Sequence, residues 1–153
     1  MANTYSQLFV HFVFAVRNRS SIINDNWQGL LYKYIAGIIE KQGHKLFSIN
    51  GMPDHIHILV SMKTTQSPSD LVYHIKRSSS LWINENKFEK GKFSWQEGFG
   101  AFSYGKSQVP AIAKYIENQK EHHKKKSFEE EYMGFLKAFD IEFDKRFTFK
   151  PIE

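Results

Sequence analysis

The first hydrophobic run, Leu8 to Val16, is nearly continuous and rich in β-branched and aromatic side chains. Such a run is typical of a strand buried on both faces, and it ends at the polar segment Arg17-Asn18-Arg19. From Trp27 to Ile39 hydrophobic residues recur at helical spacing, and Gly43 follows. The pattern therefore predicts a central strand followed by an amphipathic helix.

The middle of the chain predicts two strands, a second helix and a further strand. Lys45–Asn50 and His55–Val60 are separated by the turn-forming residues Gly51–Asp54. A helix is expected to begin at Ser67–Asp70, where a proline lies in the first turn. Glycines and aromatic residues between Trp95 and Tyr104 indicate an irregular fourth strand.

Two more helical segments complete the pattern, from Pro110 to about His123 and from Phe128 to Phe139. The order β-α-β-β-α-β followed by helix predicts an α+β, ferredoxin-like fold, in which helices cover one face of an antiparallel sheet. Its first and third strands are central neighbours. We expect one domain over residues 1–153, with a core at 1–108, a helix within 109–126, and a C-terminal helix and tail at 127–153.

Composition narrows the choice of partner. The chain has 21 Lys and Arg against 16 Asp and Glu, a net charge of about +5, and no cysteine. The excess of basic residues favours a polyanionic partner without proving one, and thiolate chemistry is excluded. We expect neither a signal peptide nor a membrane span. The charge run Lys124–Lys126 followed by Glu129–Glu131 is typical of a solvated helix end.

His55 and His57 lie two residues apart on a predicted strand, so both imidazoles project from the same face. Ile56 and Ile58 point to the other face, where the helices are expected to pack. Two imidazoles on the face opposite the core suit a divalent metal ion. The alternative, two partly solvated histidines on an open sheet face, stays open at this point.

Tyr115 and Gln119 form a second pair, because four-residue spacing on a helix places both on one face. A phenol there could attack phosphorus, and an amide oxygen one turn away could ligate a metal ion that holds the phosphate. Ile112 and Ile116 flank the tyrosine, however, and the same spacing suits an ordinary core tyrosine. The residues alone favour that structural interpretation.

Together these segments resemble a known family. Pro53–Leu59 and Tyr115–Gln119 resemble the single-tyrosine transposases of the HUH superfamily, and most closely the small insertion-sequence transposases that move elements as single strands. The resemblance extends through Trp95–Phe99, Gln119–His123 and Phe128–Tyr132. It covers nearly the whole chain in the same order.

The resemblance implies a function and a set of site residues. His55, His57 and Gln119 would hold Mg²⁺ or Mn²⁺, and Tyr115 would be the nucleophile that forms a 5′-phosphotyrosine. All three ligands are neutral, so the bound cation would keep most of its charge for the scissile phosphate. It also implies an obligate homodimer, hairpin-bearing single-stranded DNA as substrate, and a cytoplasmic location in a prokaryotic cell, with action at the nucleoid.

Basic residues spread along the chain are candidates to contact DNA phosphates: Arg17, Arg19, Lys76, Arg77, Lys106, Lys114 and Lys120. Phe99, Phe102 and Tyr104 could stack on unpaired bases. Competing hypotheses are a non-catalytic module that binds single-stranded nucleic acid, and a metal-dependent hydrolase in which Tyr115 is only structural. A third is a domesticated relative that acts on repetitive genomic hairpins.

Overall fold

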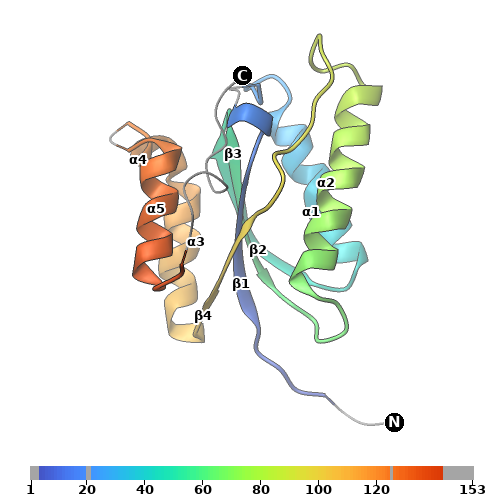
Figure 1. Cartoon of the computed structure of the whole chain (residues 1–153). Coiled ribbons are helices and arrows are strands. Elements are labelled where there is room, and N and C mark those ends of the chain that lie inside the picture. The colour runs from blue at the N-terminus through green and yellow to red at the C-terminus, as the bar shows by residue number, and fades with distance from the viewer. Residues whose placement is uncertain (1–3, 20–21, 125, 143–153) are drawn as a thin grey trace.

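The computed structural model describes residues 4–19, 22–124 and 126–142, and within them the predicted sheet is present. It has four antiparallel strands in the order β2-β3-β1-β4, which is the ferredoxin-like order with β1 and β3 at the centre (Figure 1). The α+β, ferredoxin-like prediction is therefore confirmed. The strands are β1 (Phe9–Ala15), β2 (Lys45–Met52), β3 (His55–Ser61) and β4 (Gly100–Tyr104).

One face of the sheet carries the main hydrophobic core. Helices α1 (Gln28–Lys41) and α2 (Pro68–Glu85) cover this face (Figure 1). Phe12 and Phe14 of β1 point into this core with the isoleucines of β3. The start of α2 is fixed as predicted, because Ser67 caps it by accepting a hydrogen bond from the backbone N–H of Asp70 at 3.0 Å.

The opposite face is covered too, so the histidines do not lie on an open sheet. Helices α3 (Val109–Glu117) and α5 (Phe128–Ala138) stand on this side (Figure 1). Phe128 and Leu136 of α5 pack against β1 and β4, while Val109 and Ile116 of α3 pack against β1 and β3. β1 is buried on both faces, which explains its nearly continuous hydrophobic sequence.

The helix expected from Pro110 to about His123 is divided at Asn118. Helix α3 ends at Glu117, and the short α4 (Gln119–His122) follows. The side chain of Asn50 on β2 donates hydrogen bonds to the carbonyls of Ile116 and Glu117, at 3.0 and 2.9 Å. These bonds hold carbonyl groups that a continuous helix would use, and they fix the end of α3 to the sheet.

The fourth strand is shorter than the Trp95–Tyr104 segment expected. Trp95 makes only an isolated bridge with Val16, and regular pairing of β4 with β1 begins at Gly100. Between them the chain leaves the sheet at Gly98, whose φ of +85° suits glycine. A short 3-10 turn at Arg17–Arg19 follows β1, and another at Lys106–Gln108 precedes α3. No helix in the described part could cross a bilayer.

A candidate metal centre beside a tyrosine

Strand β3 presents His55 and His57 on the face beneath α3 and α5. They pair in register with Ala15 and Val13 of β1, and neither side chain is exposed to solvent. Ile56 lies on the other face in the main core, as the alternation of a strand requires. The predicted orientation of the two histidines therefore agrees with the structure.

Tyr115 and Gln119 reach the same region from α3 and α4. The half-buried Tyr115 donates its phenolic hydrogen to Glu131, and its ring centre is 6.0 Å from that of His57. Gln119 is fully buried, with its Oε1 3.2 Å from Nε2 of His55. Its Nε2 donates to Oε2 of Glu131 at 3.2 Å. The four-residue spacing thus brings both side chains to one carboxylate.

Glu131, on α5, is the member of this cluster that the sequence pattern missed. It was expected on a solvated helix end, and that expectation is wrong for this residue, whose exposed fraction is 4%. Its Oε1 lies 2.8 Å from Nε2 of His57 and 3.4 Å from Nε2 of His55. Helical spacing from the buried Phe128 was the available signal, because residues three apart share a face.

His123 completes the cluster. Its Nε2 lies 3.1 Å from Oε1 of Gln119 and 3.3 Å from Oε1 of Glu131. One ligand atom each from His55, His57, His123 and Glu131 falls within 4.8 Å of the others, so these four residues could hold a metal ion. The imidazole nitrogens and oxygens suit a first-row divalent ion such as Mn²⁺. The carboxylate departs from the wholly neutral ligand set that we expected.

A second layer of side chains fixes the two strand histidines. Nδ1 of His55 lies 2.7 Å from Oδ1 of Asp54, and Nδ1 of His57 lies 2.7 Å from Nε2 of the buried His11. Both Nε2 atoms are thereby directed toward Glu131. Such partners orient metal-binding imidazoles and fix their tautomers.

The charges of the cluster are strongly coupled. Burial alone would lower the pKa of His55, but hydrogen bonds to Asp54 and Glu131 outweigh it and raise the pKa to about 9. Burial holds the pKa of His57 below its ordinary value. Burial, and then the hydrogen bond to Glu131, raise the pKa of Tyr115, so this phenol stays protonated until a base or a cation assists it.

The pKa of Glu131 changes in the opposite direction. Burial alone would raise it, but the hydrogen bonds from His123, His55 and His57 outweigh burial and lower it. The carboxylate is therefore ionised at the centre of the cluster, where it can bind a cation or accept the hydrogen bond from Tyr115.

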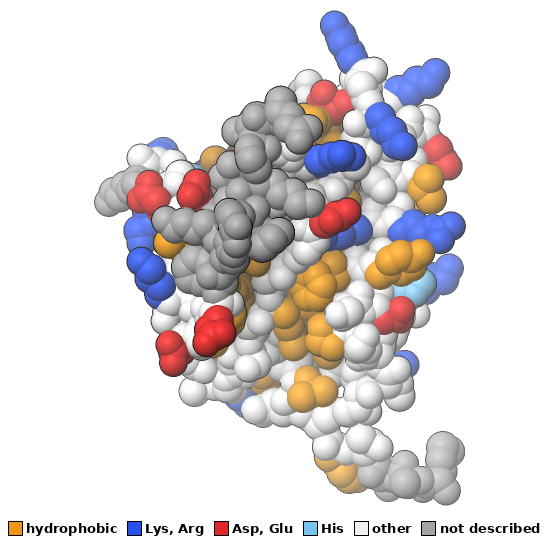
Figure 2. Space-filling view, in the orientation of Figure 1, with side chains coloured by type: hydrophobic (Ala, Val, Ile, Leu, Met, Phe, Trp, Pro, Cys, Tyr) orange, Lys and Arg blue, Asp and Glu red, His pale blue; other side chains and the backbone are white. Residues whose placement is uncertain are grey.

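Basic side chains are scattered over the face shown in Figure 2, and the basic residues predicted to contact DNA occupy several surfaces. Arg17, Arg77, Lys106, Lys114 and Lys120 have exposed side chains, and Lys120 also lies 3.5 Å from Asp25. Lys76 is half-buried and donates to two backbone carbonyls at 2.8 and 2.6 Å. The side chain of Arg19 lies outside the described part of the structure.

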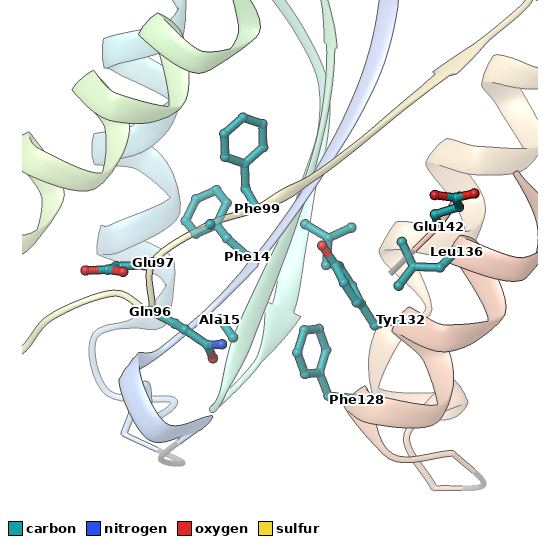
Figure 3. A pocket seen from close by; sticks show the side chains of 11 residues that line it. Phe14, Ala15, Gln96, Glu97, Phe99, Phe128, Tyr132, Leu136 and Glu142 are labelled. Atoms are coloured by element: carbon teal, nitrogen blue, oxygen red, sulfur yellow. The ribbon is translucent and has the colours of Figure 1, made fainter. Parts of the chain in front are cut away.

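The three aromatic residues expected to stack on bases differ in exposure. Phe102 is only 2% exposed, because Phe135 of α5 stacks on it with ring centres 5.1 Å apart. Its prediction as an exposed stacking face is therefore wrong. Tyr104 is partly buried, and burial raises its pKa to about 12. Phe99 is also partly buried and faces a cavity beside α5 (Figure 3).

The sheet order and the His-x-His strand agree with the HUH single-tyrosine class of transposases, and the family comparison assigns the chain to that class. The sequence profile of the family described as "Transposase IS200 like" matches residues 4–119, well over half of the chain. This protein belongs to that family.

Particular relatives agree with this assignment. The chain is 24% identical over 118 residues to the ISDra2 transposase TnpA of Deinococcus radiodurans, covering 74% of this chain and 84% of that protein.

Two solved structures share the fold. A candidate transposase from Deinococcus radiodurans R1 is similar with a TM-score of 0.62 at 21% identity, covering 78% of this chain and 95% of that one. A REP-associated tyrosine transposase bound to a REP hairpin is similar with a TM-score of 0.61 at 17% identity, covering 80% of this chain and 73% of that one.

Proposed function

We propose that this protein nicks and rejoins single-stranded DNA at the ends of an insertion sequence, with Tyr115 as the nucleophile. The observation that carries the proposal is the hydrogen bond from the Tyr115 hydroxyl to Glu131, whose other oxygen contacts His57. A tyrosine that served only for packing in the core would not require a hydrogen bond to a buried carboxylate that also contacts two histidines.

Glu131 is positioned to assist the attack. As the Tyr115 oxygen bonds to phosphorus, the phenol proton passes to Oε2 of Glu131, while Oε1 remains directed at the histidines. The bond from phosphorus to the DNA 3′ oxygen breaks, and that oxygen takes up one proton. A phosphodiester is exchanged for a 5′-phosphotyrosine, so a different 3′-hydroxyl can reseal the strand without ATP.

Mg²⁺ or Mn²⁺ would be held by His55, His57 and Gln119, with His123 and Glu131 also within reach. When bound, the cation would polarise the scissile phosphate and offset the charge that develops during attack. The protein orients the imidazoles through His11 and Asp54 and buries them, which strengthens their interactions with charge.

Single-stranded DNA with a hairpin is the proposed substrate. A structurally similar tyrosine transposase is described as bound to a REP hairpin, and this chain carries a net positive charge. The predicted phosphate contacts remain Arg17, Arg19, Arg77, Lys106, Lys114 and Lys120, whereas the ammonium of Lys76 is held by the carbonyls of Gln96 and Gly98. A domesticated enzyme acting on repetitive genomic hairpins would use the same chemistry. We also propose that the protein forms a homodimer. Light scattering would test this by measuring the mass of the particle in solution.

The test is formation of a covalent protein–DNA adduct on a denaturing gel. Protein and a single-stranded hairpin oligonucleotide are incubated with Mg²⁺ or Mn²⁺. We expect a metal-dependent adduct from the parent and none from Tyr115→Phe, which should still bind the DNA. Tyr34→Phe is the matched control, because Tyr34 is also partly buried, stacks on Trp82 on the α1 and α2 side of the sheet, and should leave the adduct intact. Cleavage without attachment would instead indicate a hydrolase, and intact DNA would indicate a binding module.

The histidine ligands need a separate control. His57→Ala should abolish the metal-dependent adduct, because it removes a buried imidazole from the centre of the cluster. His74→Ala should have no effect, since the side chain of His74 is 43% exposed on α2, where it lies beside Asp70 and Tyr73. Adduct formation by His57→Ala at the parent rate would remove this histidine from the mechanism.

A further inference from the structure

A cavity of about 290 Å³ lies where the chain before β4 separates from β1 (Figure 3). Its lining comes from residues 13–15 of β1, from residues 96–99, from Phe128, Tyr132 and Leu136 along α5, and from Glu142. The opening arises because Trp95 forms only an isolated bridge and regular pairing resumes at Gly100. The metal cluster uses none of the side chains that line this space.

Aromatic rings stand on two sides of the cavity. Figure 3 shows Phe14 and Phe99 on one side, and Phe128 and Tyr132 of α5 on the other. The last two rings have centres 5.5 Å apart. Phe14 and Phe128 are only 2% and 8% exposed, whereas Phe99 and Tyr132 are partly exposed. Phe99 and Tyr132 are therefore the rings that a planar heterocycle could contact on entering the cavity.

The side-chain amide of Gln96 also lines the cavity, and hydrogen bonds hold its backbone in place. The backbone N–H of Gln96 donates to Ala15 at 2.8 Å, and its carbonyl accepts from Lys76 at 2.8 Å. Lys76 also holds the carbonyl of Gly98, from the α2 side of the sheet. In Figure 3 the Gln96 amide extends from this fixed segment toward Phe128. An amide carries both a donor and an acceptor, and can hydrogen-bond the edge of a base.

The cavity and the metal cluster share a wall. The ring of Phe128 lines the cavity and also stacks on the imidazole of His55, with ring centres 4.5 Å apart and planes 27° apart. A nucleotide whose phosphate lies at the histidines would therefore have a neighbouring base within reach of the cavity.

We propose that this cavity binds one unstacked nucleobase of the single strand, from a nucleotide flanking the scissile phosphate. Phe99 and Tyr132 provide the stacking contacts, and Gln96 reads the edge of the base. The inference rests on the proposed function and adds to it a site at which side chains of the protein select a base. Small pockets that accept an extruded base commonly combine stacking with edge hydrogen bonds.

Base selection can be tested without cleavage. In a Tyr115→Phe background, a hairpin oligonucleotide with randomised single-stranded flanks is bound in Mg²⁺, and the recovered flanks are sequenced. We expect one flank position with a preferred base, and we expect Gln96→Ala to remove that preference. Gln7→Ala is the matched control, because Gln7 is exposed and lies outside the cavity. A preference that survives Gln96→Ala unchanged would overturn the assignment of Gln96.

The stacking contribution is tested at the same position with an abasic nucleotide. Loss of the base should weaken binding about tenfold, within the usual contribution of base stacking on aromatic side chains. The penalty should shrink in Phe99→Leu, which keeps a hydrophobic side chain but removes one ring, with thermal unfolding as the check on folding. If the abasic nucleotide weakens binding equally in the parent and in Phe99→Leu, the cavity is not the base-binding site, but the proposed function still stands. Absence of DNA binding by every protein refutes the proposed function as well.

Discussion

Glu131→Gln is the most informative single substitution, because the two carboxylate oxygens have different neighbours. Oε2 accepts hydrogen bonds from Tyr115 and Gln119, while Oε1 lies 2.8 Å from Nε2 of His57. Glutamine has nearly the same shape and can still accept a hydrogen bond, but it cannot take the phenol proton. The change therefore separates proton transfer from packing.

The expected loss follows from the role of a general base. Such groups contribute about 10² to 10⁴-fold in rate. That corresponds to about 3 to 5 kcal/mol of activation free energy. We expect adduct formation by Glu131→Gln to slow by this factor under single-turnover conditions, with DNA affinity close to that of the parent.

Metal titration distinguishes the two contributions of Glu131. If the carboxylate acts mainly as a base, saturating Mn²⁺ should not restore the rate. If it acts mainly as a ligand, more metal should be needed for half-maximal rate and saturation should recover most of it. Glu130→Gln is the matched control, because Glu130 is exposed on the same turn of α5. Parent rates for Glu131→Gln at every metal concentration would refute both roles.

Three further substitutions test the support around the site. His11→Leu removes the partner of His57 and should raise the metal concentration for half-maximal adduct about 10 to 100-fold; an unchanged titration would contradict this. Asn50→Ala should cost about 1 to 2 kcal/mol in urea unfolding and slow the adduct, because two hydrogen bonds to the end of α3 are lost. Asn86→Ala, its control at the end of α2, should leave the adduct rate unchanged. Burial lowers the pKa of Lys76 from 10.5 to about 8, so the unfolded chain binds more protons between these values. The unfolding free energy of the parent relative to that of Lys76→Met should therefore rise with pH through that window, by at most about 3 kcal/mol.

The local sequence pattern was sufficient to predict how the two histidines of β3 are oriented. Alternation on a strand determines that His55 and His57 share a face and that Ile56 faces away, whatever the rest of the fold does. The order of strands and helices was also sufficient to predict the sheet, since few topologies suit that order. These features depend on neighbours in sequence, which a single chain displays directly.

The role of Glu131 could not be predicted in the same way. Its sequence neighbours, Glu129 and Glu130, make the segment look like a solvated helix end, and only the packing of α5 on β1 and β4 buries the third carboxylate. The break at Asn118 likewise depends on a hydrogen-bonding side chain from β2, far away in sequence.

The sequence by itself determined the fold class and which residues share a face, because strand and helix periodicity are local properties of the chain. Only the tertiary structure decided that α3 and α5 close over the histidines, that Glu131 lies between them and Tyr115, and that a cavity opens beside Phe128. The burial of a side chain and the grouping of charges depend on contacts between segments that are far apart in the sequence. Only the packing of the folded chain determines those contacts.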